Sequence, residues 1–248
     1  MHYIPIKTPI VTTDTNLHDF LKSQIENKLQ EGDILLISSK IVAFTQKRLV
    51  DLSDIKVSEE AQKYADISKS SAEFCQLVLD ESDQILGAVP GAMLTIKDGV
   101  TIANAGIDQS NVPENNAVLW PKDPEEKATE LLQFLKNLMG IKKLGIIMTD
   151  SHCLPLRSGS TAFALAADGF EGVVDERGEK DLFGREMQIT QRNVADMIAG
   201  AADMLMGDTN ESIPLVIVRD ASVNFVDRFD QSLLKMEKEK CLFESLYG

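Results

Sequence analysis

An Asp98-Gly99 pair between two β-branched runs is the feature that most limits what this chain can fold into. Residues 93–97 precede the pair and residues 100–103 follow it. Asp-Gly favours the tight turn that joins two antiparallel strands, so these segments predict a β-hairpin. Because helices and strands alternate only in part along the rest of the chain, the sequence predicts a mixed α+β fold rather than a doubly wound parallel sheet.

The spacing of apolar residues predicts the other elements. Uninterrupted apolar runs at residues 33–38 and 143–149 predict strands that are covered on both faces. Helical periodicity predicts helices over residues 16–31, 58–65, 70–80, 125–139 and 191–206, with Gly32, Gly140 and Gly207 ending the first, fourth and fifth. We expect a last strand at residues 215–219 and an exposed helix in the charged tail at residues 235–240.

The charge of the chain excludes two classes of protein. Its 248 residues include 25 Lys and Arg against 39 Asp and Glu, a formal net charge of -14. There is no cationic excess to displace counterions from nucleic-acid phosphates or to hold an anionic membrane surface. Apolar runs fall far short of the roughly 20 residues that span a bilayer, and no signal peptide is recognisable. We therefore expect a cytoplasmic protein with a single domain over residues 1–248, or two subdomains.

Several familiar site signatures are missing from the sequence. Cys75, Cys153 and Cys241 lie far apart and form no pattern typical of a disulfide framework or a zinc site. The chain has neither a phosphate-binding P-loop nor a glycine-rich dinucleotide turn. Ser151, His152 and Cys153 are consecutive, which at first suggests a hydrolase with a nucleophile beside its base. Neighbouring side chains of an extended segment point in different directions, however, so their adjacency is not evidence for such a pair.

Residues 104–111 are the first segment that suggests a site. Asp108 and Asn111 follow the predicted hairpin, and Gly106 frees the backbone just before them. Carboxylate and amide oxygens within one turn suit Mg²⁺ or Mn²⁺, which take one or two protein carboxylates together with phosphate oxygens and water. An Asx-type turn that closes the hairpin is the plainer interpretation of the same residues.

Thr149-Asp150-Ser151 is the second such segment. An acid directly after a buried strand, followed by a hydroxyl, is typical of a metal ligand at a sheet edge, although an N-cap or turn aspartate has the same pattern. Together, Asp108 and Asp150 would form a divalent-cation site whose charge offsets a polyphosphate. Arg157, beside small hydroxyl residues, either cradles a phosphate or carboxylate or lies in a solvated loop.

Taken in order, these segments resemble the coenzyme F420-0:L-glutamate ligase family, the CofE-like γ-glutamyl ligases. The similarity runs from residue 8 to residue 219. The segments that carry it are residues 32–42, 104–111 and 149–151, an Asp-Leu-Phe-Gly-Arg block at 181–185, and residues 190, 195–196 and 206–208. The resemblance implies an α+β fold built as a mixed sheet with helices, and an intertwined homodimer.

The resemblance also implies a function. Members of the family use GTP and a divalent metal to join L-glutamate to a carboxylate acceptor, here coenzyme F420-0 or a related molecule. Transfer of the γ-phosphate would give an acyl phosphate, which the glutamate amine attacks. By position, the ligands of Mg²⁺ or Mn²⁺ would be Asp108, Asp150, Ser151 and Asp208, with Ser151 where the family usually has a threonine. The nucleotide contacts would be Thr8, Pro9, Ile10, Val11, Ser39, Lys40, Asn111, Met206, Gly207, Asp208, Thr209, Asn210, Glu211, Ser212 and Ile213. Lys40 and Arg157 would be the catalytic cations.

Three positions depart from the family pattern. Phe44 stands where the family usually has a lysine near the nucleotide, which leaves ATP open as an alternative to GTP. Leu154 and Leu156 replace an arginine and a tryptophan in the loop after Asp150, which suggests a different acceptor and makes a folate γ-glutamyl ligase the alternative within the family. A metal-dependent phosphohydrolase and a non-catalytic nucleotide-binding protein stay open as alternatives of other classes.

Overall fold

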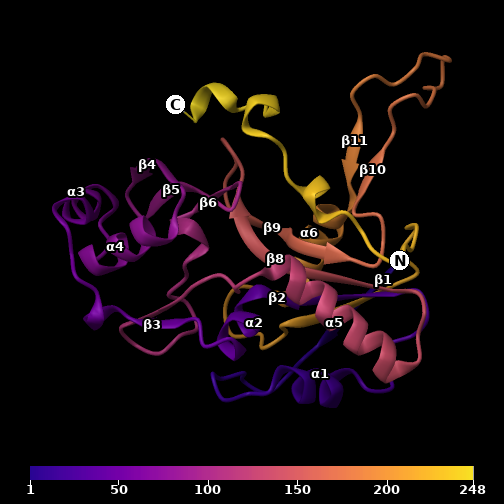
Figure 1. Ribbon diagram of the computed structural model, residues 1–248, viewed down its shortest axis with the longest axis horizontal. Helices are drawn as coiled ribbons and strands as arrows, with labels where there is room; N and C mark the ends of the chain where they lie inside the picture. Colours follow the sequence, from indigo (N-terminus) through magenta and orange to yellow (C-terminus); the bar gives the residue numbers. More distant parts are fainter. Residues whose placement is uncertain (248) are drawn as a thin grey trace.

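A five-stranded sheet lies at the centre of the fold in the computed structural model, which describes residues 1–247 (Figure 1). The order of its strands is β1 (His2–Ile6), β12 (Leu215–Arg219), β2 (Asp33–Ser38), β8 (Leu144–Cys153) and β9 (Ser160–Asp168). Only β2 and β8 run parallel among these neighbours, and the other pairs are antiparallel. The predicted mixed α+β fold is confirmed.

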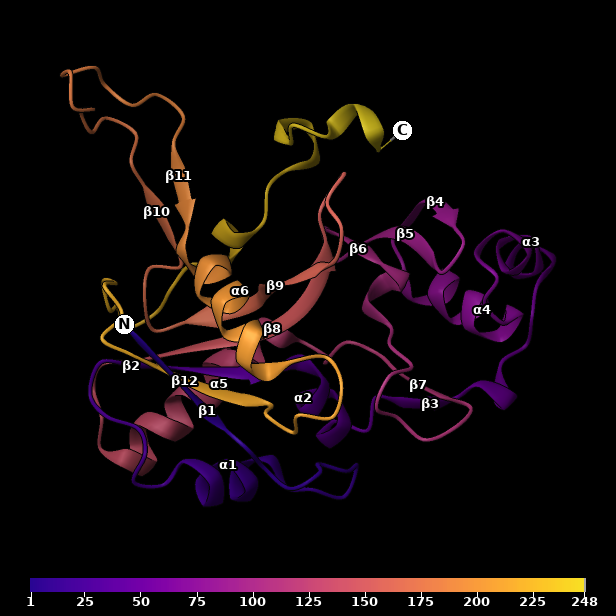
Figure 2. The ribbon, with the colours of Figure 1, turned by 180° about the vertical axis from the view of Figure 1, so that it is seen from behind.

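Helices cover both faces of this sheet, because the side chains of its central strands alternate between two apolar clusters (Figure 2). Leu35 and Ile37 of β2 lie in the first cluster, whereas Ile34 and Leu36 lie in the second. The first cluster contains residues of α1 (Leu17–Ile25), α2 (Ser39–Thr45) and α5 (Pro124–Met139), and the second contains residues of α6 (Val194–Met206). Both faces of β2 are therefore buried, as its apolar run predicted.

A smaller unit with an apolar cluster of its own lies beside the main sheet (Figure 1). Its elements are β3 (Leu49–Asp51), α3 (Glu59–Ser68), α4 (Ala72–Glu81), β4 (Gln84–Val89), β5 (Ala92–Lys97), β6 (Val100–Ala103) and β7 (Asn116–Val118). The predicted hairpin is confirmed as β5 and β6, and its turn places Asp98 at φ 50° and Gly99 at φ 76°. Positive φ at both positions is what this tight turn requires. The division into one domain or two subdomains stays a prediction.

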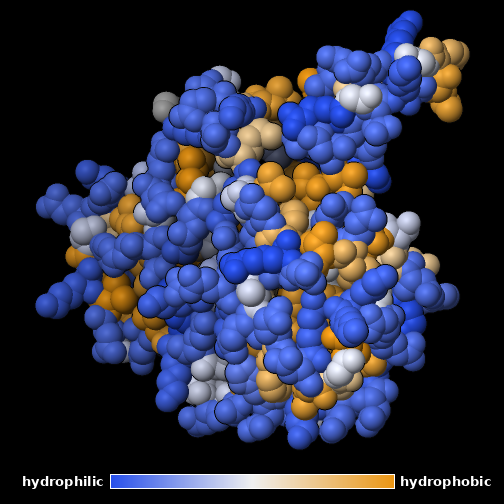
Figure 3. Space-filling view, turned by 45° about the vertical axis from the view of Figure 1, so that its right-hand side comes forward, coloured by the Kyte–Doolittle hydropathy of each residue, from blue (hydrophilic) through white to orange (hydrophobic). Residues whose placement is uncertain are grey.

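A long hairpin arm projects from the main body beside α6 (Figures 1 and 2). It starts where β10 (Val173–Asp175) pairs with β11 (Gln191–Asn193), and residues 176–190 extend beyond these strands. Hydrophobic residues gather at its far end (Figure 3). Within residues 1–247, no helix has both the length and the apolar character needed to cross a membrane.

Two predicted helices were too long. The first ends at Ile25 because Glu26 leaves helical geometry and Asn27 adopts φ 65°, so Gly32 does not cap it. Leu29 still reaches the core from the irregular turn that follows, which explains why its spacing suggested a longer helix. The helix predicted from residue 191 begins at Val194, because the three preceding residues pair with β10. The tail forms only a short 3₁₀ turn at Lys238–Lys240 instead of the predicted helix.

The correction that matters most for the site concerns β8, which continues through Cys153, whereas the apolar run predicted a strand only as far as residue 149. Asp150 pairs with Phe163 of β9, a strand that the sequence pattern did not predict. Polar residues remain extended there because β9 provides partners for their backbone groups. The register shifts between Met148 and Thr149, and an irregularity of this kind redirects the side chains that follow it.

Candidate functional site

A cavity of about 640 Å³ opens where β2 and β8 end side by side. This volume is typical of a site for a small molecule. Four segments distant in the sequence form its wall: residues 8–13, 38–44, 108–113 and 203–214, together with residues 149–151 of β8. All residues predicted to bind the nucleotide or the metal line this one cavity. Their individual roles stay predictions, but their proximity is a property of the fold.

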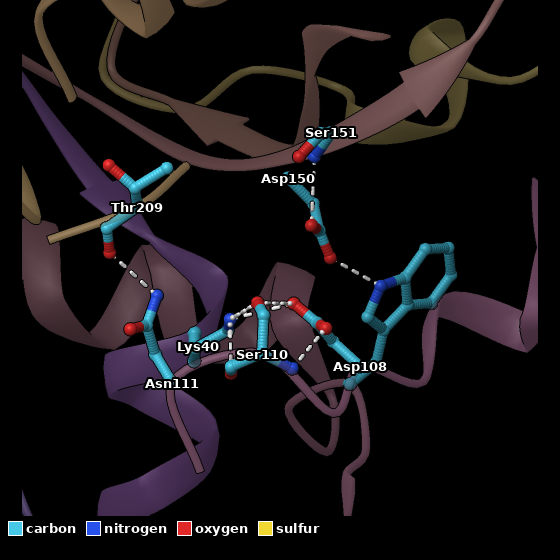
Figure 4. Close-up of polar contacts among 8 residues, drawn as sticks. Lys40, Asp108, Ser110, Asn111, Asp150, Ser151 and Thr209 are labelled. Atoms are coloured by element: carbon cyan, nitrogen blue, oxygen red, sulfur yellow. Dashed lines mark hydrogen bonds and ion pairs between the residues drawn. The ribbon is translucent and has the colours of Figure 1, made fainter. Parts of the chain in front are cut away.

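Lys40 lies in the first turn of α2, which begins directly after β2. The sequence pattern predicted the strand at residues 33–38 but not this short helix after it. The helix turns the chain at the sheet edge and directs the Lys40 ammonium toward the 108–110 segment (Figure 4). Lys40 Nζ donates to Asp108 Oδ2 at 2.7 Å, and to the Ser110 hydroxyl and carbonyl oxygens at 3.0 Å each.

Asp108 is held by its backbone and by its neighbours. Its N–H and carbonyl pair with Val118 at 3.0 and 2.8 Å, which anchors the segment against β7. Its carboxylate accepts hydrogen bonds from the Ser110 N–H and hydroxyl, both at 2.7 Å. Desolvation alone would raise the pKa of Asp108, but the Lys40 ammonium and the Ser110 donors outweigh it, so the pKa lies below its ordinary value. Asp108 is therefore ionised at neutral pH.

Asp150 has the opposite electrostatic character. The residue is half-buried at the cavity wall, and desolvation by the surrounding protein atoms raises its pKa to about 6. Hydrogen bonds from the Ser151 N–H at 2.8 Å and the Trp120 indole at 2.5 Å, and one from Ser39, counteract the shift only in part. The negative charge of Asp108 adds to the increase. Asp150 thus lacks a cation of its own, and a positive ligand in the cavity would stabilise its ionised form.

The 207–213 segment closes one side of the cavity. Asn111 Nδ2 donates to the Thr209 carbonyl at 2.9 Å (Figure 4). Thr8 N–H donates to the Ser212 carbonyl at the same distance. Gly207 adopts φ 67°, and a Cβ there would lie 2.4 Å from the carboxyl carbon of Glu211. The Glu211 side chain could move away, but the positive φ of Gly207 disfavours any residue with a Cβ, so the turn that leads from α6 into this segment favours glycine.

Sequence reasoning missed one acidic and one aromatic neighbour of the site. Asp203 of α6 lines the cavity, and burial together with the charge of Asp208 raises its pKa. The signal that could have found it was its helical spacing, three residues before Met206 on the same face. Trp120 contacts Asp150, but a lone tryptophan gives no indication in the sequence of its partner.

The predicted metal ligands offer oxygen atoms only. Asp108, Asp150 and Ser151 line the cavity together with Asp208. Within residues 1–247, however, no group of three or more His, Cys, Asp or Glu side chains lies close enough to hold a metal by itself. A cation here would therefore need ligand or water oxygens to complete its shell, which is how Mg²⁺ is usually bound beside phosphates.

The departures from the family pattern lie in two places. Phe44 lines the cavity and is buried, so the missing lysine concerns the pocket itself. Arg157, by contrast, is exposed in the connection between β8 and β9 and does not line the cavity of its own chain. Leu154 and Leu156 of the same connection are also exposed. The structure thus separates Arg157 from the other predicted site residues.

Fold and cavity together define an α+β protein with a loop-built pocket for a small molecule, whose wall combines carboxylates with a lysine. The chain belongs to the F420-0:gamma-glutamyl ligase family, whose sequence profile matches residues 5–220. The coenzyme F420:L-glutamate ligase of Methanococcus maripaludis strain C7 is 34% identical over 242 residues, which cover 96% of each chain. The enzymes of the same name from Archaeoglobus fulgidus and Methanosarcina mazei are 35% and 37% identical, and the alignments cover 87% and 86% of this chain and 85% and 83% of theirs. The family resemblance inferred from the sequence is confirmed.

Proposed function

We propose that this chain is a nucleotide- and divalent-metal-dependent ligase that joins L-glutamate to a small carboxylate acceptor, coenzyme F420-0 or a related molecule. Relatives named coenzyme F420:L-glutamate ligase match almost the whole chain, which supports glutamate ligation. The observation that carries the proposal is the cavity, because Lys40, Asp108 and Asp150 line it together with the predicted nucleotide segments.

The proposed reaction has two steps. An oxygen of the acceptor carboxylate attacks the γ-phosphorus of GTP or ATP, the bond to the β-phosphate oxygen breaks, and an acyl phosphate forms. The α-amine of glutamate then attacks the acyl carbon, phosphate leaves, and the amine loses a proton as the amide forms. Neither step needs a covalent protein nucleophile, so the chain contributes by binding and aligning the reactants and by neutralising their charge.

Lys40 is the proposed cation of the phosphate-transfer step. Its side chain is only 25% exposed, and its ion pair with Asp108 fixes the ammonium at the cavity wall. A charge that is already oriented stabilises developing negative charge on the phosphoryl oxygens without reorganising during the reaction. A similar role for Arg157 stays a proposal that requires the 154–159 connection to reach a cavity, its own or that of another copy.

Mg²⁺ or Mn²⁺ is the proposed metal, with Asp108, Asp150, Ser151 and Asp208 as ligands. Their oxygen atoms fit a hard divalent cation, and the partly desolvated Asp150 carboxyl has a pKa of about 6, which an opposite charge would lower. When bound, the ion supplies positive charge that neutralises the phosphate oxygens.

The identities of the nucleotide and the acceptor depend on the two departures. The family pattern favours GTP as the nucleotide. Because Phe44 in the cavity wall replaces a lysine of that pattern, ATP is the alternative. Leu154 and Leu156 offer apolar surface where the family has an arginine and a tryptophan. This difference favours an acceptor other than coenzyme F420-0 itself, and a folate is the alternative within the same reaction class.

We also propose a homodimer. The arm exposes Leu182, Phe183 and Ile189 almost completely, at 100%, 90% and 87%. Exposed large apolar side chains on a projecting element are typical of a protein interface. An arm that reaches across a second copy would bury these residues and produce the intertwined arrangement that the family resemblance implies.

Phosphate release tests the reaction class. With GTP or ATP, Mg²⁺ or Mn²⁺ and an acceptor, the ligase proposal predicts that glutamate accelerates release strongly. Release that is independent of glutamate would indicate the metal-dependent phosphohydrolase, and nucleotide binding without any turnover would indicate the non-catalytic alternative. An acceptor labelled with ¹⁸O in its carboxylate should transfer one ¹⁸O to the released phosphate if an acyl phosphate forms, and none if it does not.

A further inference from the structure

Trp120 is the only tryptophan of the chain, and its indole contacts the site directly. It follows β7 and is 3% exposed. Its Nε1–H donates to Oδ2 of Asp150 at 2.5 Å, while the Ser151 N–H donates to Oδ1 at 2.8 Å. Each carboxylate oxygen of Asp150 therefore has a protein donor on a different side, which fixes the rotation of the carboxylate plane.

The indole is itself held from several directions. The backbone carbonyl of Trp120 accepts a hydrogen bond from Arg48 Nε at 3.0 Å. The ring of Phe163 lies beside the indole, with centroids 6.3 Å apart. Gly106 provides the remaining space, because a Cβ at this position would lie 2.1 Å from Trp120 Nε1. The indole can approach the 104–106 backbone this closely only because residue 106 has no side chain.

An indole is well suited to orient a metal ligand without competing for the metal. Its N–H only donates, so it bonds to the carboxylate and offers no lone pair to a cation. Its two side-chain torsions are locked by the surrounding packing, in contrast to a serine or lysine donor that can rotate away. Groups that orient a metal ligand in this way affect metal affinity although they never touch the ion.

We propose that Trp120 is a positioning residue, seated against Gly106, that fixes the carboxylate of Asp150 in the orientation needed to bind the divalent cation. This inference rests on the proposed function, in which Asp150 is a metal ligand. It extends that function to a residue outside the cavity wall. It also gives the glycine of the 104–108 segment a specific role, because Gly106 makes room for the indole.

Metal affinity in the absence of nucleotide provides the test. Electron paramagnetic resonance of Mn²⁺ measures free and bound ion for the wild-type chain, for Trp120→Phe, which keeps an aromatic ring but loses the donor, and for Phe134→Leu. The last variant is the control for the loss of a packed aromatic side chain, because Phe134 of α5 packs against the ring of His18 and does not line the cavity. We expect the Kd for Mn²⁺ to rise about 10- to 100-fold in Trp120→Phe and to stay near the wild-type value in Phe134→Leu.

The outcomes separate the two proposals. An equal Kd for the wild-type chain and Trp120→Phe overturns the positioning role and leaves the metal site standing, whereas a wild-type chain that binds no Mn²⁺ overturns the metal site and this inference with it. If Trp120→Phe does not fold, nuclear magnetic resonance decides, since the chain has a single indole N–H signal. That signal should shift in Asp150→Asn and on saturation with Mg²⁺, and a signal that moves in neither case contradicts the proposal.

Discussion

The cavity and the arm carry the two sequence blocks that most strongly indicated the family, and their surroundings differ sharply. The 104–108 segment is tied into the cavity wall by the backbone pairing of Asp108 and by the Lys40 ion pair. The 181–185 block lies at the far end of the arm, where Leu182 and Phe183 are exposed. The first block thus packs within its own chain, whereas Leu182 and Phe183 of the second pack against no other part of residues 1–247.

The end of the arm is nevertheless locally ordered. Asp181 Oδ1 accepts hydrogen bonds from the N–H groups of Phe183 and Arg185 at 2.8 and 2.9 Å, which fixes the turn that presents the apolar side chains. A defined turn with exposed apolar residues differs from a solvated loop, whose exposed residues are mostly polar. Substitutions in the cavity should therefore change the rate of the reaction, whereas substitutions in the arm should change the association of two chains.

The largest effect should follow the loss of a carboxylate in the cavity. Asp150→Asn keeps the shape of the side chain but removes the negative charge proposed to bind the metal. We expect metal-dependent glutamate ligation to fall by at least about 10³-fold, since the lost charge stabilisation amounts to several kcal/mol. Steady-state kinetics measure the loss, and circular dichroism should show an intact fold. Ligation at the wild-type rate would contradict the proposal that this cavity is the active site.

Replacing the two predicted cations should give unequal effects. Lys40→Met removes the ammonium at the cavity wall, and we expect kcat to fall about 10²- to 10³-fold, as for other groups that stabilise developing charge. Arg157→Gln alters an exposed residue outside the cavity and should change kcat about twofold or less if no other copy needs it. A large loss in Arg157→Gln that disappears in a monomeric variant would instead place Arg157 in the site of a second copy.

The raised pKa of Asp150 predicts that the free energy of unfolding of the metal-free chain depends on pH. Its folded pKa of about 6 exceeds its ordinary value of 3.8, so the folded state binds the proton more tightly. The free energy of unfolding should therefore fall as the pH rises from about 4 to about 6 and stay low above that range. Asp150→Asn does not titrate, although its amide group leaves one of the two donors, Trp120 or Ser151, without an acceptor at every pH. The stability of the variant relative to the wild type should therefore increase by about 1 to 3 kcal/mol between well below pH 4 and above pH 6, where the lower figure allows for solvent in the cavity.

Urea unfolding with a chelator present measures this difference. Well below pH 4 this relative gain should vanish, because the wild-type carboxyl is then protonated in both states. A stability difference between the variant and the wild type that is the same at pH 4 and pH 8 would contradict the assignment of the shift to Asp150. A stability gain combined with a loss of ligation would mark Asp150 as a residue kept for function at the expense of stability.

The smallest effect on the fold, and the clearest on association, should come from the arm. Phe183→Asp places a charge at the exposed end, and the stability of the single chain should change by about 0.5 kcal/mol or less. Sedimentation velocity should show a shift from dimer to monomer. Val89→Asp is the control, since Val89 is also exposed, at 62%, but lies at the end of β4. If both variants stay dimeric, the arm is not the interface.

Local signals in the sequence predicted much of the fold and less of the site. The turn at Asp98-Gly99 and the apolar run of β2 were correct because each depends on neighbouring residues only. The extension of β8 was missed because its partner, β9, lies beyond a loop and determines whether residues 151–153 can be extended. The contact between Trp120 and Asp150 was missed for the same reason, since neither residue indicates the other. Asp108 and Asp150 were paired from the sequence only by their shared chemistry and by the family resemblance, and it is the fold that brings both to the same cavity.

Mass spectrometry of the product tests the central claim most directly. The chain is incubated with GTP or ATP, Mg²⁺ or Mn²⁺, L-glutamate and, in parallel, coenzyme F420-0 or a folate as acceptor, beside Asp150→Asn as the matched control. We predict that one acceptor gains the mass of a glutamyl unit with the wild-type chain, and that this gain is lost with the variant. A gain that Asp150→Asn preserves, or nucleotide hydrolysis with both acceptors unchanged, would contradict the account.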